Sequence, residues 1–211
     1  MRHIMVLNAK GGCGKSTLAT NLASYFATVK GKKVALADYD PQQSGLDWLE
    51  RRPERVAPIH GLAAYKTGLR GVPKGTDIVI IDAPARSHGK ELATLIKHSE
   101  TILVPVLPSS IDMQAVAKFL EELLPAAQKK AKVAVVANRV KENTLIFEEL
   151  DDYLADLRSP YIGALRDAQN YVRAYSRGLG IFELPEYLAW PDLEQWEEIT
   201  DFLNSSRSRL K

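Results

Sequence analysis

A glycine-rich segment near the start of the chain combines the residue types that bind phosphate. It follows a short apolar stretch and reads Lys10-Gly11-Gly12-Cys13-Gly14-Lys15-Ser16-Thr17. Glycines let the backbone fold into a concavity whose N–H groups point inward, and the N-terminus of a following helix adds its positive dipole end. Lys15 then reaches the β- and γ-phosphates, and the Ser16 hydroxyl is a ligand for Mg²⁺. An ordinary strand-to-helix turn is the alternative, but the Gly-Lys-Ser ending in this position favours phosphate binding.

Aspartates at the ends of two other apolar stretches supply oxygen ligands for the same chemistry. Asp82 directly follows the apolar residues 78–81, and Pro84 enforces an extended exit from that strand. We interpret Asp82 as a support for Mg²⁺ through a water molecule, in preference to a turn or helix cap. Asp38 and Asp40 stand two residues apart, so both side chains point to the same side. A turn-forming role is a reasonable alternative for Asp38.

The elements that must position these residues form a regular alternation along the chain. Apolar runs without polar alternation are typical of strands covered on both faces, and they occupy residues 4–7, 34–37, 78–81, 102–106 and 133–137. Amphipathic segments with three- and four-residue spacing lie between them. We expect an α/β fold with a mostly parallel, twisted sheet and helices on both faces. Residues 161–165 predict one more strand, and residues 168–176 and 193–203 predict helices.

Length and composition further limit the number of domains and the possible classes of function. The chain has 211 residues, with 28 Lys+Arg against 26 Asp+Glu and a formal net charge of +2. We expect one domain over residues 1–211, because this length is ordinary for a single α/β unit. The near-neutral balance does not by itself indicate a nucleic-acid binder. The single cysteine cannot form an intrachain disulfide or a Cys-rich metal site. The apolar runs are too short for a membrane span.

The glycine-rich segment resembles the deviant P-loop of the ParA/MinD superfamily of ATPases, because a lysine, Lys10, precedes the glycines. We refer to residues 10–17 as the P-loop. Residues 38–42, Asp-Tyr-Asp-Pro-Gln, resemble the switch I segment of that family, and residues 77–84 resemble its Walker B strand and switch II. Residues 104–109, 136–139 and 166–184 follow its later landmarks in order. The chain departs from the family pattern at Ala9, Ala83 and Ala85.

The resemblance implies a P-loop NTPase that hydrolyses ATP to ADP and phosphate with Mg²⁺. It implies catalytic roles for Lys15, for Asp40, which places the attacking water, and for Lys10. In the family, this lysine crosses to the nucleotide of a second subunit in an ATP-sandwich homodimer; the alternative is a solvated lysine. Asn138 would bind the adenine edge, unless it is only a strand-end cap. Cys13 would contribute its backbone alone.

Features that the sequence lacks indicate which branch of the superfamily it resembles. One cysteine per subunit argues against the iron-protein branch. The C-terminal residues 204–211 are basic but offer only Leu210 for insertion, so we expect no membrane anchor. Because the first strand begins at once, we expect no N-terminal helix-turn-helix domain. The remaining resemblance is to the small ParA class. It implies a cytoplasmic protein that is nucleoid-associated in the ATP state.

That class binds DNA without sequence preference as an ATP dimer and releases it when an adaptor protein stimulates hydrolysis. The implied task is to partition or position a plasmid, a chromosome or a protein organelle. Candidate phosphate contacts are Arg158, Arg166, Arg173 and Arg177, and also Lys129, Lys130 and Lys132. Solvated faces balanced by acidic neighbours are the alternative for each.

Two other functions stay open at this stage. One is a metabolic ATP-dependent ligase or kinase of the same fold, and the other is a MinD-like spatial regulator. The apolar residues near the C-terminus predict an amphipathic helix that covers the sheet, in preference to a partner surface. These residues are Trp190, Pro191, Trp196, Ile199 and Phe202.

Overall fold

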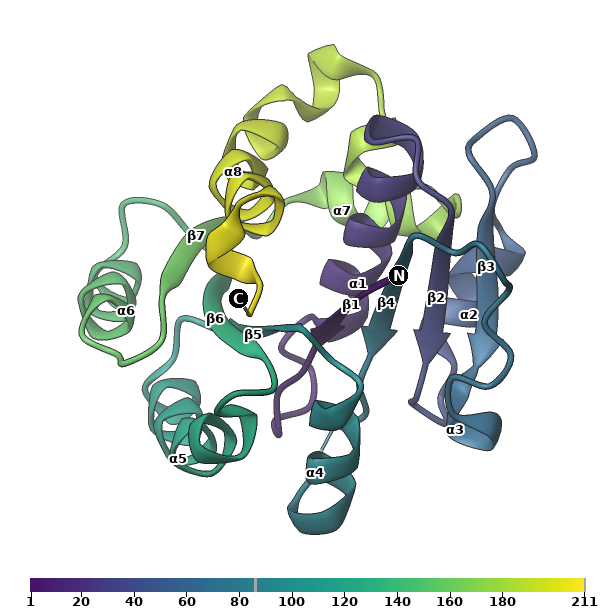
Figure 1. Ribbon diagram of the computed structural model, residues 1–211. Helices are drawn as coiled ribbons and strands as arrows, with labels where there is room; N and C mark the ends of the chain where they lie inside the picture. The colour runs from purple at the N-terminus through teal and green to yellow at the C-terminus, as the bar shows by residue number, and fades with distance from the viewer. Residues whose placement is uncertain (86, 211) are drawn as a thin grey trace.

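A seven-stranded parallel sheet organises the computed structural model, which describes residues 1–85 and 87–210 (Figure 1). The strand order is β3-β2-β4-β1-β5-β6-β7, so the first strand lies in the middle of the sheet. The strands are β1 (Arg2–Val6), β2 (Val34–Asp38), β3 (Ile59–Ala63), β4 (Ile78–Asp82), β5 (Thr101–Val106), β6 (Lys132–Val140) and β7 (Tyr161–Arg166). The expected α/β fold with a parallel sheet is confirmed.

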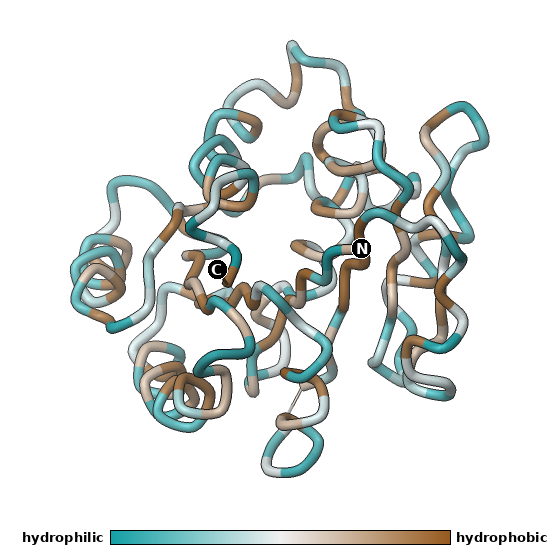
Figure 2. The backbone as a smooth tube through the Cα atoms, in the orientation of Figure 1, coloured by the Kyte–Doolittle hydropathy of each residue, from teal (hydrophilic) through white to brown (hydrophobic). Residues whose placement is uncertain are grey.

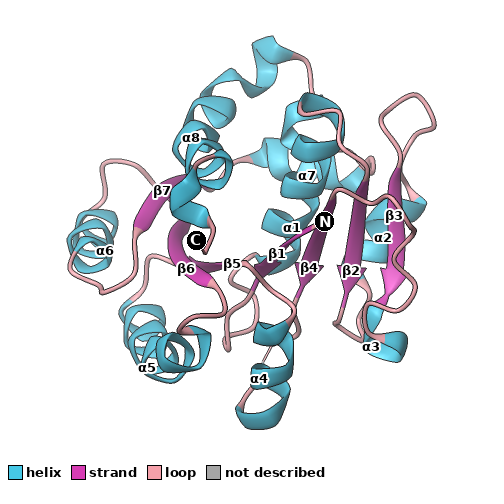
Figure 3. Ribbon diagram, viewed as in Figure 1, coloured by secondary structure: helices cyan, strands magenta, loops and turns pink. Residues whose placement is uncertain are grey.

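Helices cover both faces of this sheet (Figure 3). One face packs against α1 (Lys15–Ser24), the π-helical turn η1 (Tyr25–Val29), α2 (Ser44–Glu50), α7 (Gln169–Ser176), the 3₁₀ turn η2 (Ile181–Glu183) and α8 (Glu186–Asn204). The other face packs against α3 (Ala64–Thr67), α4 (Gly89–Lys97), α5 (Ser110–Ala127) and α6 (Leu145–Ala155). A last 3₁₀ turn, η3 (Ser206–Ser208), follows α8. No helix of the described residues is long and apolar enough to cross a membrane.

The two layers of helices explain why the central strands are uniformly apolar. Along β1, Ile4 and Val6 face one core and Met5 faces the other, and all three are fully buried. Figure 2 shows the hydrophobic colour running along these inner strands, while hydrophobic and hydrophilic residues alternate along the helices. Both faces of these central strands exclude water, so polar residues are tolerated only near the strand ends.

One strand, β3, is missing from the sequence-based prediction. It lies at the edge of the sheet beside β2, and its His60 and Gly61 are exposed. An edge strand that is half exposed lacks the uninterrupted apolar run that marks the inner strands. The additional strand predicted at residues 161–165 is present as β7 at the opposite edge.

The parallel arrangement brings the segments that follow all seven strands to one edge of the sheet. The segments that follow β1, β2, β4, β6 and β7 all leave from the carboxyl ends of their strands. In open parallel sheets, ligands bind outside these ends. The fold therefore gathers the motifs of the sequence analysis at one place.

Candidate functional site

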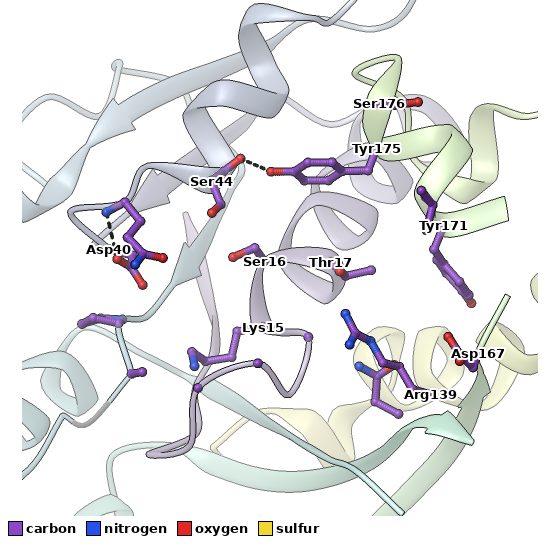
Figure 4. Close-up of a pocket in the computed structure, with 18 of the residues that line it drawn as sticks. Lys15, Ser16, Thr17, Asp40, Ser44, Arg139, Asp167, Tyr171, Tyr175 and Ser176 are labelled. Atoms are coloured by element: carbon purple, nitrogen blue, oxygen red, sulfur yellow. Dashed lines mark hydrogen bonds between the residues drawn. The ribbon is translucent and has the colours of Figure 1, made fainter. Parts of the chain in front are cut away.

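A cavity of about 1010 Å³ opens at the carboxyl edge of the sheet (Figure 4). Residues from the P-loop, the loops after β2 and β4, the end of β6 and the β7–α7 junction line it. The predicted site residues among them are Gly11, Gly12, Gly14, Lys15, Ser16, Thr17, Asp40, Asn138 and Arg166. Lys10, Cys13 and Asp82 lie beside or beneath the cavity and do not line it.

The P-loop folds as the glycine pattern predicts. Gly12 and Gly14 have φ values of 77° and 94°, a left-handed conformation that side chains other than glycine rarely adopt. A Cβ atom at Gly14 would lie 2.1 Å from Nδ2 of Asn138. That same Nδ2 donates a hydrogen bond of 2.8 Å to the carbonyl of Cys13. One N–H of the Asn138 amide therefore braces the loop. The role of Asn138 toward the adenine edge stays a prediction.

Lys15 supplies a positive charge inside the loop. Its side chain is buried, and Nζ donates a 3.0 Å hydrogen bond to the carbonyl of Lys10. Burial raises the pKa of the neighbouring Cys13 thiol, with Lys15 acting in the opposite direction. The thiol is thus kept protonated and buried, as expected for a residue that contributes only its backbone.

Asp82 is buried, and neither of its carboxylate oxygens has a hydrogen-bond partner of good geometry among the described residues. Burial raises its pKa to about 7; the nearby Ser16 hydroxyl lowers the pKa, and the charge of Asp38 raises it further. An uncompensated carboxylate beside a hydroxyl fits a hard cation, which prefers oxygen ligands. The described residues hold no group of three or more His, Cys, Asp and Glu for a metal. Mg²⁺ is usually held by one or two carboxylates together with waters and substrate phosphates.

The two switch I aspartates have different surroundings. The Asp38 carboxylate is fully buried and accepts hydrogen bonds from the backbone N–H groups of Asp40 at 3.0 Å and Gly45 at 2.9 Å. It thereby shapes the turn and holds the start of α2, which confirms the structural alternative for this residue. Asp40 lines the cavity and accepts a 2.9 Å hydrogen bond from the backbone of Gln42.

Lys10 does not extend into the cavity. Its Nζ forms an ion pair of 2.6 Å with Asp112, in the first turn of α5. The Asp112 side chain is only 7% exposed, whereas that of Lys10 is 34% exposed. Ser109 caps this helix and also bonds to the Asp112 carboxylate. The two lysines of the P-loop therefore point to different partners.

Three residues of the cavity wall were not singled out by the sequence. Tyr175 of α7 donates a 2.6 Å hydrogen bond to the carbonyl of Ser44, directly after switch I (Figure 4). Tyr171, one turn earlier, accepts a 3.0 Å bond from the indole of Trp196. Arg139 has a φ of 54°, which is uncommon for a non-glycine residue, and it lines the cavity together with Thr17. The only feature of the sequence that points to Arg139 as a residue of the cavity wall is its position next to Asn138.

The basic residues proposed to contact DNA fall into two separate groups. Arg173 and Arg177 are exposed on α7, which borders the cavity. Arg158, Lys129, Lys130 and Lys132 are exposed at the opposite edge, where β6 and β7 begin. Arg166 differs from both groups, because its Nε donates a 2.7 Å hydrogen bond to the fully buried Asp192 of α8. That bond favours a structural role for Arg166.

Residues 4–181 match the family model of the CobQ/CobB/MinD/ParA nucleotide binding domain. The chain belongs to this family. Over 192 residues it is 29% identical to the maintenance of carboxysome distribution protein A of Halothiobacillus neapolitanus, covering 86% of this chain and 87% of that protein. It is 33% identical over 155 residues to the chromosome-partitioning ATPase Soj of Thermus thermophilus, covering 58% and 61% of the two chains.

The fold has close counterparts among solved structures. Apo McdA of Cyanothece superposes with a TM-score of 0.74 at 18% identity, covering 97% of this chain and 100% of that one. MinD of Aquifex aeolicus gives a TM-score of 0.75 at 18% identity over the full length of both chains. These two similarities establish the fold of a ParA/MinD-type ATPase for this chain.

Proposed function

We propose that this chain is a ParA-type ATPase that forms an ATP-sandwich dimer and binds DNA without sequence preference. An adaptor protein stimulates its hydrolysis of ATP, and the cycle positions a large cargo. The observation that carries the proposal is the pair of lysines in one P-loop, Lys15 turned into the phosphate cradle and Lys10 turned out of it. The names of two relatives, for carboxysome distribution and for chromosome partitioning, support a positioning task.

Four residues have separate roles in the proposed hydrolysis: Lys15, Ser16, Asp40 and Asp82. Lys15 and the loop N–H groups bind the phosphates, and Asp40 orients the attacking water through its carboxylate. Ser16 and Asp82 would hold Mg²⁺, which neutralises charge on the phosphates. Because burial raises the pKa of Asp82 to about 7, a cation bound beside the carboxylate would favour its ionised form near neutral pH.

Lys10 supplies charge to the second subunit in this proposal. A cation delivered from a partner stabilises the charge that develops on the transferring phosphoryl group, as an arginine finger does. In the single chain, Lys10 is paired with Asp112 on α5 and does not point into its own phosphate cradle. ATP bound between two copies gives the lysine a stronger anionic partner. Dimerisation then depends on ATP.

The helix α7 is placed to link the nucleotide to DNA. Its inner residues Tyr171 and Tyr175 line the cavity, and its outer residues Arg173 and Arg177 are exposed. Through Tyr175 it is bonded to Ser44, which follows Asp40 by four residues and lines the same cavity. A dimer doubles the basic surface of a chain whose net charge is only +2. DNA affinity that appears only in the ATP state follows from this arrangement.

Parallel measurements of ATP hydrolysis and DNA retention test the proposal, using the wild type, Lys10→Ala and Lys15→Ala. We expect slow basal turnover by the wild type that DNA and an adaptor accelerate, and loss of DNA retention in Lys15→Ala. DNA affinity should fall by ~0.9 log units per log unit of salt for each phosphate contact. Light scattering of Asp40→Ala with saturating Mg-ATP should show a dimer.

Two results would contradict the proposal. A monomeric Asp40→Ala protein under saturating Mg-ATP would refute the sandwich dimer. Fast turnover that is indifferent to DNA, with no DNA retention at low salt, would favour a small-molecule ligase or kinase of the same fold.

A further inference from the structure

The outer side of α8 carries large apolar side chains that the fold does not use. Trp196, Ile199 and Phe202 are buried against the sheet, as predicted for a covering helix. Tyr187 and Trp190, however, are 81% and 59% exposed. These two side chains form what we call the aromatic patch. Tyrosine and tryptophan are the side chains most often found at the energetic centre of protein interfaces.

A row of carboxylates continues from the aromatic patch along the same side of α8. The exposed positions Tyr187, Trp190, Glu194, Glu197 and Asp201 follow one another at steps of three, four, three and four residues. Such spacing places them on one stripe of a helix, about 21 Å long at ~1.5 Å per residue. The stripe is therefore aromatic at its start and acidic over the rest of its length.

The charges of this stripe are not balanced within the described part of the chain. None of its carboxylates belongs to an ion pair among residues 1–85 and 87–210. The last turn of α8 contains no basic residue, although cations are favoured there by the helix dipole. Like charges at three- and four-residue spacing also destabilise a helix. A ligand that supplies positive charge would relieve both effects.

The aromatic patch is linked to the nucleotide cavity through a short chain of hydrogen bonds. Asn170 donates to the carbonyl of Leu188 at 2.8 Å and to the Asp192 carboxylate at 2.7 Å. Asp192 in turn accepts from Arg166, which lines the cavity. A partner that presses on the start of α8 therefore contacts the backbone held by this network.

We propose that the outer stripe of α8 is the docking site for a basic segment of a partner protein. Apolar side chains of that segment pack on the aromatic patch, and its lysines or arginines face the carboxylates and stack on Trp190. The occupant is a basic polypeptide because the stripe is acidic, and the same charge repels DNA and anionic membranes. Identifying this partner with the adaptor that stimulates hydrolysis rests on the proposed function; the docking itself does not.

The three tryptophans of the chain allow a direct binding assay. Trp48 and Trp196 are fully buried and only Trp190 is exposed, so acrylamide quenching of fluorescence reports on Trp190. The probe is a synthetic helical peptide of lysine, arginine and leucine with leucines at a three-four repeat. We expect the peptide to protect Trp190 from quenching in the absence of nucleotide. The Trp190→Phe protein provides the baseline.

Variants of exposed residues then locate the site without threatening the fold. The double variant Glu194→Lys/Glu197→Lys should weaken binding of the fluorescein-labelled peptide by at least about tenfold, and Tyr187→Ala should weaken it as well. The matched control is Glu148→Lys/Glu149→Lys, which reverses two exposed carboxylates on α6. That control should leave the affinity within about twofold.

Three outcomes would overturn the docking site. They are an unprotected Trp190 in the presence of the peptide, an equal loss of affinity in the α6 control, and protection of Trp190 by duplex DNA or anionic vesicles in place of the peptide. Peptide binding without any effect on ATP turnover would instead refute the link to the adaptor. Peptide binding by a protein that lacks ATPase activity would refute the proposed function and leave the docking site standing.

Discussion

Asp112 holds Lys10 in the single chain, so replacing Asp112 by asparagine should strengthen ATP-dependent dimerisation. The substitution removes the charge and preserves the shape of the side chain beside Ser109. In the proposed sandwich, Lys10 must leave Asp112 before it reaches the nucleotide of the other subunit. Every dimer therefore breaks two of these ion pairs, and the variant has none to break.

The size of the effect follows from the geometry of the pair. At 2.6 Å, two unit charges attract by ~6 kcal/mol at an effective dielectric constant of about 20. The 34% exposure of Lys10, desolvation and the ordering of a flexible lysine offset most of this attraction. A net value of about 1–2 kcal/mol per pair remains. Two pairs correspond to about 2–4 kcal/mol, or about 30- to 700-fold in the dimerisation constant.

Sedimentation equilibrium with saturating Mg-ATP measures this constant, in an Asp40→Ala background that limits hydrolysis. Asp112→Asn also removes an acidic residue from the first turn of α5, which the helix dipole favours. Glu148→Gln in the first turn of α6 is the matched control for that loss. An unchanged dimerisation constant in Asp112→Asn would show that Lys10 keeps its partner in the dimer. The reasoning about the lysine would then be wrong.

Further predictions address the cavity itself. Burial raises the pKa of Asp82 to about 7 from an unfolded value of 3.8, so its charge lowers folded stability as pH rises through this window. Asp82→Asn should raise the free energy of unfolding by on the order of 2–4 kcal/mol above pH 7 and not below pH 4, measured by urea denaturation without Mg²⁺. Tyr175→Phe removes the bond to Ser44 and should lower DNA stimulation of turnover severalfold at unchanged basal rate; equal stimulation would refute the link. Gly14→Ala should displace Asn138 and abolish binding of a fluorescent ATP analogue.

The sequence was most informative where one continuous segment makes the site. The P-loop is such a segment, because its glycine conformations and its position between a strand and a helix are local properties. Asp82 could also be singled out from the sequence, because a carboxylate at the end of a buried apolar strand has few roles other than binding a cation. The inner strands were predicted for a related reason: burial on both faces imposes an apolar run that few other structures require.

The contacts that distinguish this chain join residues that are far apart in the sequence. Lys10 and Asp112 are separated by 102 positions, and Tyr175 and Ser44 by 131. No periodicity or motif reports on such pairs, because each depends on how strands are ordered in the sheet. Arg166 shows that charge alone does not predict the role of a residue. It looked like a surface contact, but Asp192 at the buried side of α8 engages it.

Lys10 contacts both Lys15 and Asp112, through different atoms. Its backbone carbonyl accepts a hydrogen bond from Nζ of Lys15, and its own Nζ forms the ion pair with Asp112. A nucleotide phosphate is a stronger acceptor for Lys15 than a neutral carbonyl, because a charged acceptor makes a shorter and stronger hydrogen bond. In the proposed mechanism, phosphate binding draws Lys15 away from the Lys10 carbonyl, which keeps its 3.3 Å hydrogen bond from the Cys13 thiol. The ion pair with Asp112 is then the contact of the Lys10 side chain that a second subunit must displace. In the proposed mechanism, ATP thus prepares the lysine for release in the same step that creates its new partner, so dimerisation would wait for nucleotide.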